Sequence, residues 1–432
     1  MNPDTRIARV VQSVTRVEPD ELAPCLWSLV YFFCLLCGYF VLRPIREEMG
    51  VANGVENLQW LFTGTFITML AVVPIFGAVV RRWPRRLFMP GIYYFFIANI
   101  LLFYVLFELD ILAAHTTRVF FVWISVFNLF VVSVFWSFMA DIFAPEQARR
   151  LFGFIAAGGS AGALTGPLLT ALLAPTLGVT NMLLVAATIL SFALVAMHKL
   201  IGFARGSGKA EDKPIGGSVL GGLKLVARSP YLMGICLLIL IYTTLATFLY
   251  FHQARLVEQA FTDPGERTAM FAFIDFAVNA LTLSLQLLLT ARIVRRLGIG
   301  WTLAIIPCVV VVGFLSLALV PTLAMLVVVQ ITRRAGNYAV MKPARDMLYS
   351  VVDRESKYKA KNFIDTAVYR GGDAMAGWAY TGLGALGLGL SGIAWIGVPL
   401  ALLWIYVSLK LGQAYKRLAG ELPGKQKERV RA

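Results

Sequence analysis

The stretch GFARGSGKAEDKPIGGSVLGGLKLVARSP (202–230) interrupts a chain that is otherwise largely apolar. It is rich in glycine, serine and lysine, which is typical of a linker between structured segments. The whole chain has 432 residues, of which 59% are hydrophobic and only 15% are charged. Soluble domains carry about 25% charged residues and a lower apolar share. The composition therefore indicates a polytopic membrane protein with a linker near its middle.

Apolar segments of about 20 residues, the length that crosses a bilayer as a helix, recur on both sides of this linker. We predict an all-α fold with twelve transmembrane spans, at 24–48, 57–80, 87–108, 118–140, 151–174, 178–200, 229–253, 268–291, 300–320, 324–346, 361–386 and 390–411. The predicted domains are an N-terminal segment (1–23), a six-helix bundle (24–200), the linker (201–228), a second six-helix bundle (229–411) and a basic tail (412–432).

Landmark residues repeat across the linker at a nearly constant spacing. The three pairs are Arg43 with Arg255, 212 residues apart, Arg82 with Arg296, 214 apart, and Gly158 with Gly371, 213 apart. A constant offset indicates a duplicated unit. Two six-helix halves with a linker between them resemble the major facilitator superfamily, in which substrate binds between the halves near the middle of the bilayer.

Lysine and arginine are distributed unevenly among the predicted loops. The loop RRWPRR (81–86), the loop DRESKYKAK (353–361) and the tail KQKERVR (425–431) lie on one side of the twelve-span count, whereas the loops near 175–180 and 386–390 have neither residue. The positive-inside rule then places both termini and the linker in the cytoplasm. We expect a multi-pass protein of a bacterial inner membrane. The net charge of +15 reflects this topology, so we expect the lipid bilayer and no nucleic acid as partner.

Ionisable residues inside the predicted spans are the candidates for function, because such a residue is costly unless it faces a partner or a watery cavity. The sequence marks as substrate-binding candidates Arg43, Arg46, Glu47, His252, Arg255, Arg333, Arg334, Tyr338, Lys342, Arg345 and Arg370. Three acidic residues are expected to balance charge or to carry a coupling proton, namely Asp275, Asp365 and Asp373. Internal ion pairs are the alternative interpretation, but the cations in these spans outnumber the carboxylates. Because the arginine fork suits phosphate and carboxylate, the excess predicts an anionic substrate.

Three segments together resemble the ATP/ADP translocase (nucleotide transport protein) family of plastids and intracellular bacteria. They are KPARDMLYSVVDRESKYKAKNFIDTAVYRGGDAMAGW (342–378), VLRPIREEMGV (41–51) and FWSFMADIFAPEQARRLFGFIAAGGSAGA (135–163). The resemblance implies exchange of ATP for ADP across a membrane, with Arg46 and Lys359 or Lys361 as phosphate contacts. Family glutamates in spans 4 and 7 have no acidic counterpart in VWISVFNLFVVSVFW (122–136) and LYFHQAR (249–255).

We therefore expect a monomeric secondary transporter, not an enzyme, that moves a small phosphorylated anion such as ATP or ADP by alternating access. No Gly-x-x-x-x-Gly-Lys-[Ser/Thr] loop occurs, and no cofactor or metal is expected. The run GGSAGALTG (158–166) predicts close helix packing instead of a phosphate loop. Two other functions stay open. One is proton-coupled transport of another organic anion, with Asp275 or His252 titrating, and the other is a lipid-handling or non-transporting membrane protein.

Overall fold

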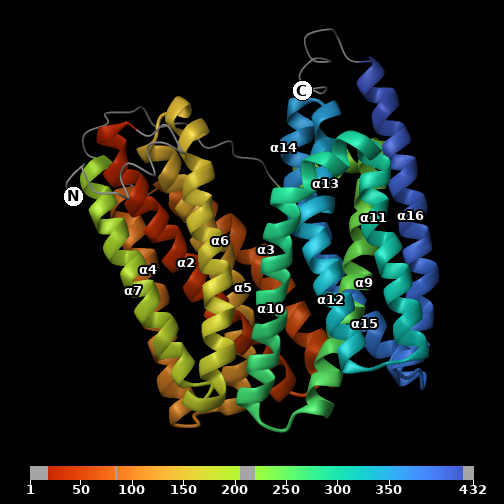
Figure 1. The fold of residues 1–432 in the computed structure, drawn as a ribbon, viewed down its shortest axis with the longest axis horizontal. Coiled ribbons are helices and arrows are strands. Elements are labelled where there is room, and N and C mark those ends of the chain that lie inside the picture. The colour runs from red at the N-terminus through yellow and green to blue at the C-terminus, as the bar shows by residue number, and fades with distance from the viewer. Residues whose placement is uncertain (1–17, 83–84, 205–218, 422–432) are drawn as a thin grey trace. The chain divides into compact units, whose positions relative to one another are not determined.

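The computed structural model describes residues 18–82, 85–204 and 219–421 of the chain, and within these ranges helices occur and no β-strand does (Figure 1). By length and composition, ten of the described helices can cross a membrane. Parts of the predicted N-terminal segment, linker and tail fall on residues 1–17, 205–218 and 422–432, outside the described residues. The all-α prediction is confirmed.

The two predicted spans that carry most of the ions, 324–346 and 361–386, are interrupted helices. The first consists of α12 (Leu323–Gly336), the π-helical turn η2 (Asn337–Met341) and α13 (Lys342–Leu348). The second consists of α14 (Arg354–Phe363), the π-helical turn η4 (Ile364–Val368) and α15 (Tyr369–Ala385). With the ten apolar helices, these two segments account for the twelve predicted spans.

The described residues form two compact units that do not follow the linker strictly. Unit 1 contains residues 18–52, 72–82, 85–204 and 262–276, and unit 2 contains residues 53–71, 219–261 and 277–421. Two helices are therefore shared: α3 (Leu58–Arg82) begins in unit 2 and ends in unit 1, and α10 (Pro264–Leu288) begins in unit 1 and ends in unit 2.

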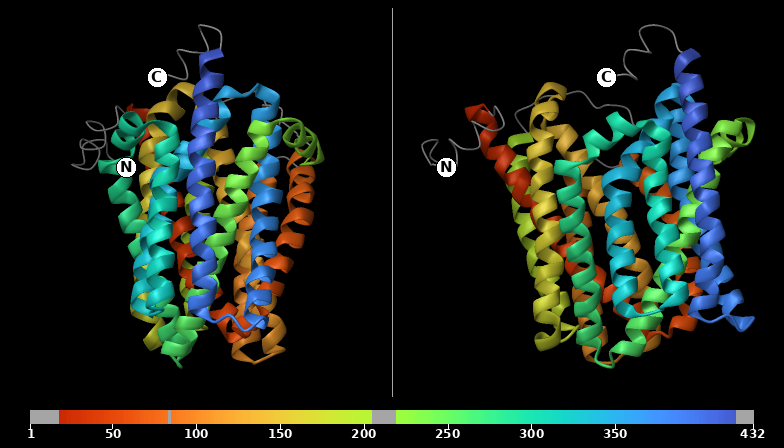
Figure 2. Two further views of the ribbon diagram at one scale, coloured as in Figure 1. Left: turned by 90° about the vertical axis from the view of Figure 1, so that its right-hand side faces the viewer. Right: turned by 45° about the vertical axis from the view of Figure 1, so that its right-hand side comes forward.

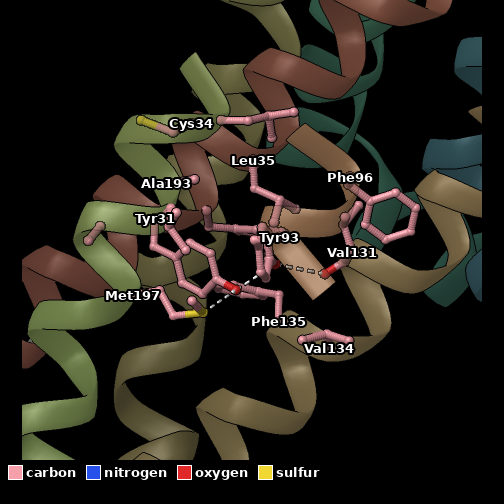
Figure 3. Packing of buried hydrophobic residues seen from close by; sticks show 14 of the residues in the cluster. Tyr31, Cys34, Leu35, Tyr93, Phe96, Val131, Val134, Phe135, Ala193 and Met197 are labelled. Carbon is pink, nitrogen blue, oxygen red and sulfur yellow. Dashed lines mark hydrogen bonds between the residues drawn. The ribbon is translucent and has the colours of Figure 1, made fainter. Parts of the chain in front are cut away.

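Unit 1 is built around α2, which packs against α5, α6 and α7. Its complete helices are α2 (Pro19–Ala52), α4 (Arg85–Glu108), α5 (Ala113–Ile142), α6 (Pro145–Leu177) and α7 (Asn181–Ala204). Figure 3 shows the polar contacts inside this apolar core, where the Tyr31 hydroxyl donates to the Tyr93 hydroxyl, and Tyr93 donates to the Val131 carbonyl. Tyr31, Tyr93 and their aromatic neighbour Phe135 are fully or almost fully buried, so these hydroxyls need the partners they have.

Glycines on one face of α6 allow it to approach the backbone of α2. A Cβ atom at Gly158 would meet the Leu29 carbonyl, and one at Gly162 would meet the backbone of Phe33 and Cys37. Spacing of small residues by four positions gives a continuous seam of this kind in membrane helices. The predicted packing role of GGSAGALTG (158–166) is confirmed.

Unit 2 is built on α9, α11 and α16, and α16 runs alongside α11 (Figures 1 and 2). These three helices are α9 (Pro230–Ala260), α11 (Thr290–Leu319) and α16 (Leu390–Glu421). The unit also contains η1 (Val55–Asn57), α8 (Val219–Arg228) and η3 (Tyr349–Val351). The first part of α3 is fastened to α15 by two hydrogen bonds, because Trp378 donates to Thr63 over 3.1 Å and Thr381 donates to Gln59 over 3.2 Å.

A proline accounts for the first interruption. Pro343, near the start of α13, has no N–H to donate to the Ala339 carbonyl four residues earlier. Thr290 of α11 takes the place of that donor, since its hydroxyl donates to the Ala339 oxygen over 2.9 Å. The π-helical turn η2 lies directly before Pro343, and such turns occur often at functional sites.

Candidate functional site

Unit 1 contains a group of candidate residues at the end of α2 and in the middle of α10. Arg43 Nε lies 3.5 Å from Asp275 Oδ2. Arg46 donates to the Phe121 carbonyl over 3.2 Å and to Glu47 over 3.1 Å, and its guanidinium lies 3.8 Å from the centre of the Phe121 ring. The candidate cations of unit 1 are thus held by carboxylates, a carbonyl and an aromatic ring.

Two residues that the sequence candidates omit complete this group. Arg267, in the first turn of α10, donates to Glu48 of α2 over 2.9 Å, and Glu48 is only 1% exposed. Glu48 adjoins the candidate Glu47 in the same REE run, so it was visible in the sequence. Arg267 lies one residue before the predicted span 268–291, and nothing in the sequence links it to α2. The ion pairs of this group join three arginines to three carboxylates within the described part of unit 1.

Within the described part of unit 2, candidate residues take part in the following ion pairs. Arg345 of α13 lies 3.6 Å from Asp365 of η4, and Lys361 of α14 lies 2.7 Å from Asp346 of α13. These two pairs link the two interrupted spans. The third pair is local to α15, where Arg370 lies 3.6 Å from Asp373, three residues later.

Arg333 differs from these cations, because no carboxylate among the described residues forms an ion pair with it. Its side chain on α12 is buried, with a relative exposure of 5% for the residue. Its Nη2 donates to Gln330 Oε1 over 2.7 Å, while its Nε is buried without a hydrogen-bond acceptor. A buried charge needs a compensating partner or a site for one, so Arg333 is the centre of the candidate site.

Tyrosine side chains lie within electrostatic range of Arg333. The hydroxyl of Tyr369 donates to that of Tyr242 over 3.5 Å. Tyr242, Tyr338 and Tyr369, together with the guanidinium of Arg334, lie close enough to interact electrostatically with Arg333. Tyr338 is 38% exposed, which leaves part of its ring available for contact with a planar group.

Close helix packing fixes this tyrosine pair. Gly372 of α15 lies against Thr243 of α9, where a Cβ atom at the glycine would collide with the threonine side chain. Tyr242 and Tyr369 are the neighbours of these two residues in the chain. The small residue thus brings α9 and α15 together beside the arginine.

The remaining candidates have other surroundings. His252 is completely buried, and its two ring nitrogens each lie 2.9 Å from a backbone carbonyl, that of Phe248 and that of Leu390. Arg255 lies over the ring of Tyr380 at 5.4 Å.

Two lysines of the candidate set lie at more open positions. Lys342 is exposed and Lys359 is half-buried. A Cβ atom at Gly222 of α8 would meet the Lys359 carbonyl, so α8 packs on the backbone of α14. The substrate-binding roles of these residues and of the other candidates stay predictions.

Gln253 and Gln330 join α9 to the candidate site and were not among the sequence candidates. The amide of Gln330 donates to Gln253 Oε1 over 2.8 Å and to the Leu249 carbonyl over 3.2 Å. Both glutamines are buried. A neutral amide inside an apolar span is a weaker signal than a charge, although burying it without partners is also costly.

The sequence profile of the Major Facilitator Superfamily matches residues 27–356, and the chain belongs to this superfamily. It is therefore a multi-pass membrane transporter, and its substrate is a small molecule.

Among curated proteins, the chain is similar to ADP,ATP carrier protein 1 of Chlamydia muridarum, with 22% identity over 82% of this chain and 81% of that carrier. It is also similar to ADP,ATP carrier protein 1 of Chlamydia trachomatis, with 21% identity over 92% of this chain and 90% of that carrier. Both matches confirm the resemblance found from the motifs. Among solved structures, the POT family transporter PepTSo has the same fold, with a TM-score of 0.66, 11% identity, and coverage of 91% of this chain and 98% of that one.

Proposed function

We propose that this chain is a secondary active transporter that exchanges nucleotides of the ATP/ADP type by alternating access. The observation that carries the proposal is the buried guanidinium of Arg333, which has no carboxylate partner among the described residues. Removing an arginine from water costs several kcal/mol unless a partner compensates it. A phosphorylated substrate would supply that partner, since the guanidinium fork matches phosphate oxygens.

Two further observations support a nucleotide as the substrate. Tyr338 and Tyr369 lie within electrostatic range of Arg333, and aromatic rings stack on planar groups such as a nucleobase. The curated relatives that cover four fifths or more of this chain are named ADP,ATP carriers. In this proposal Arg334 assists Arg333.

The test is uptake of radiolabelled ATP into proteoliposomes loaded with ADP, compared for wild type, Arg333→Gln and Arg417→Gln. Arg417 is a matched control, because its side chain is 83% exposed and its ion pair within the described residues is with Glu421 at 3.8 Å. A hydrogen bond to a charged group contributes about 1.5 to 3 kcal/mol, so Arg333→Gln is expected to reduce uptake by roughly tenfold or more. Arg417→Gln is expected to retain it. Equal uptake by wild type and Arg333→Gln would contradict the proposed site.

The same experiment separates the two other functions. Asp275 and Glu47 are buried carboxylates in unit 1, which favours proton-coupled transport of an organic anion as the second candidate. Uptake that follows a pH gradient and is independent of internal ADP would indicate that function. Thermal stabilisation of the purified protein by lipids, with none by soluble anions, would instead indicate a lipid-handling protein.

A further inference from the structure

The amide group of Gln330 has a fixed orientation. Its nitrogen lies 3.2 Å from the Leu249 carbonyl, and a backbone carbonyl can only accept a hydrogen bond. The same nitrogen donates to Gln253 Oε1 over 2.8 Å. With both amide hydrogens directed at α9, the oxygen of Gln330 is the atom left to face Arg333, and it accepts from Arg333 Nη2 over 2.7 Å.

This arrangement holds the arginine without neutralising it. A guanidinium has five N–H donors, and the Gln330 oxygen occupies one of them with no formal charge. A glutamate at position 330 would have nearly the same shape and would give Arg333 an ion-pair partner at the same place. The neutral amide therefore leaves the positive charge of Arg333 without a carboxylate among the residues that the structure describes.

We propose that Gln330 is a positioning residue that fixes the guanidinium of Arg333 and keeps the site cationic, so that the substrate has to provide the compensating anion. Gln253 and the Leu249 carbonyl act on Arg333 indirectly, because they accept hydrogen bonds from the Gln330 amide and so fix its orientation. This inference rests on the proposed function, since it requires that an anion binds at Arg333.

The deciding experiment is a double-mutant cycle of Gln330→Glu and Arg333→Gln, read by thermal melting of the purified protein without ligand. Gln330→Glu also places a carboxylate oxygen, which can only accept, against the Leu249 carbonyl in both backgrounds. The change is therefore expected to lower the melting temperature clearly more in the Arg333→Gln background, where the carboxylate is buried alone, than in the wild-type background, where it pairs with a buried cation. An equal shift in both backgrounds would mean that position 330 is not coupled to the charge of Arg333, and would overturn the proposal.

A second readout uses ADP as the probe and the shift in melting temperature that it causes. Gln330→Glu is expected to weaken apparent ADP affinity by about tenfold or more, because the introduced carboxylate competes for Arg333. Gln330→Met, which removes the hydrogen bonds and adds no charge, is expected to weaken it less. If Arg333→Gln removes the ADP response and Gln330→Glu leaves it intact, the inference fails while the proposed function stands. If Arg333→Gln leaves the response intact, the proposed site fails as well.

Discussion

Arg267 and Glu48, which lie 219 residues apart in the sequence, form a hydrogen-bonded ion pair of 2.9 Å that joins the beginning of α10 to the end of α2. The carboxylate is almost completely buried, and the arginine side chain is only 14% exposed. Removing one residue of such a pair lowers the free energy of unfolding, because the charge of the other residue then remains buried without compensation.

Replacement of Glu48 by alanine should therefore destabilise unit 1 by about 3 to 5 kcal/mol. Glu48→Gln retains a hydrogen-bond acceptor for Arg267 and should cost less. Denaturant unfolding in detergent would measure the difference. Glu56→Ala is a suitable control, since that glutamate is exposed. Equal stability of Glu48→Ala and wild type would show that the pair is compensated by solvent.

Gly162→Leu should abolish the folded yield. Its side chain would have to occupy the space of the Phe33 carbonyl and the Cys37 backbone nitrogen, and backbone atoms of a packed helix cannot move aside as a flexible side chain can. Gly153→Leu, on the same helix α6, has no atom within 4 Å of its added Cβ and should be tolerated. Size-exclusion profiles of the two variants give the comparison.

Thr290→Val should destabilise unit 2 by about 0.5 to 1.5 kcal/mol, because it removes the hydroxyl that donates to the Ala339 carbonyl. Pro343 cannot supply the missing hydrogen bond. Thr282→Val is the matched control, since the Thr282 hydroxyl donates to the Val278 carbonyl four residues earlier in α10, which as a helix carbonyl also has a backbone donor. If the two variants had equal melting temperatures, the hydroxyl of Thr290 would not stabilise the interrupted helix.

Lys361→Ala should change stability by less than about 1 kcal/mol, because Lys361 and Asp346 are each more than a third exposed and such pairs contribute little. The family resemblance implies that Lys359 or Lys361 contacts phosphate. A large loss of ATP uptake together with unchanged melting would support that role, whereas unchanged uptake would limit Lys361 to its pair with Asp346. Lys357→Ala, an exposed neighbour on α14, serves as the control.

The sequence predicted the helical spans well, because twenty-residue apolar runs have few alternatives in a membrane protein. It predicted less about their interior. Pro343 signals a disturbed helix, but the π-helical turn before it depends on Thr290 of another helix. The second interruption, at η4, has no proline at all.

The candidate site was predictable as a region and not as a set of contacts. The density of ions in span 324–346 identified the segment around Arg333. Pairs such as Arg370 with Asp373 follow from helical spacing. The pairing of Arg345 with Asp365 depends on how two separate spans pack, so the sequence could not show that Arg333, and not Arg345, lacks a carboxylate.

Unit 1 contains a segment that is synthesised after the linker, and this sets the order in which the unit can assemble during biosynthesis. Unit 1 includes residues 262–276, which follow the linker and bring Arg267 and Asp275 to α2. Its assembly cannot be completed when the first six spans have left the ribosome, and has to wait until the eighth has entered the membrane. During that interval the pairs of Glu48 with Arg267 and of Arg43 with Asp275 are not yet formed in the nascent N-terminal half.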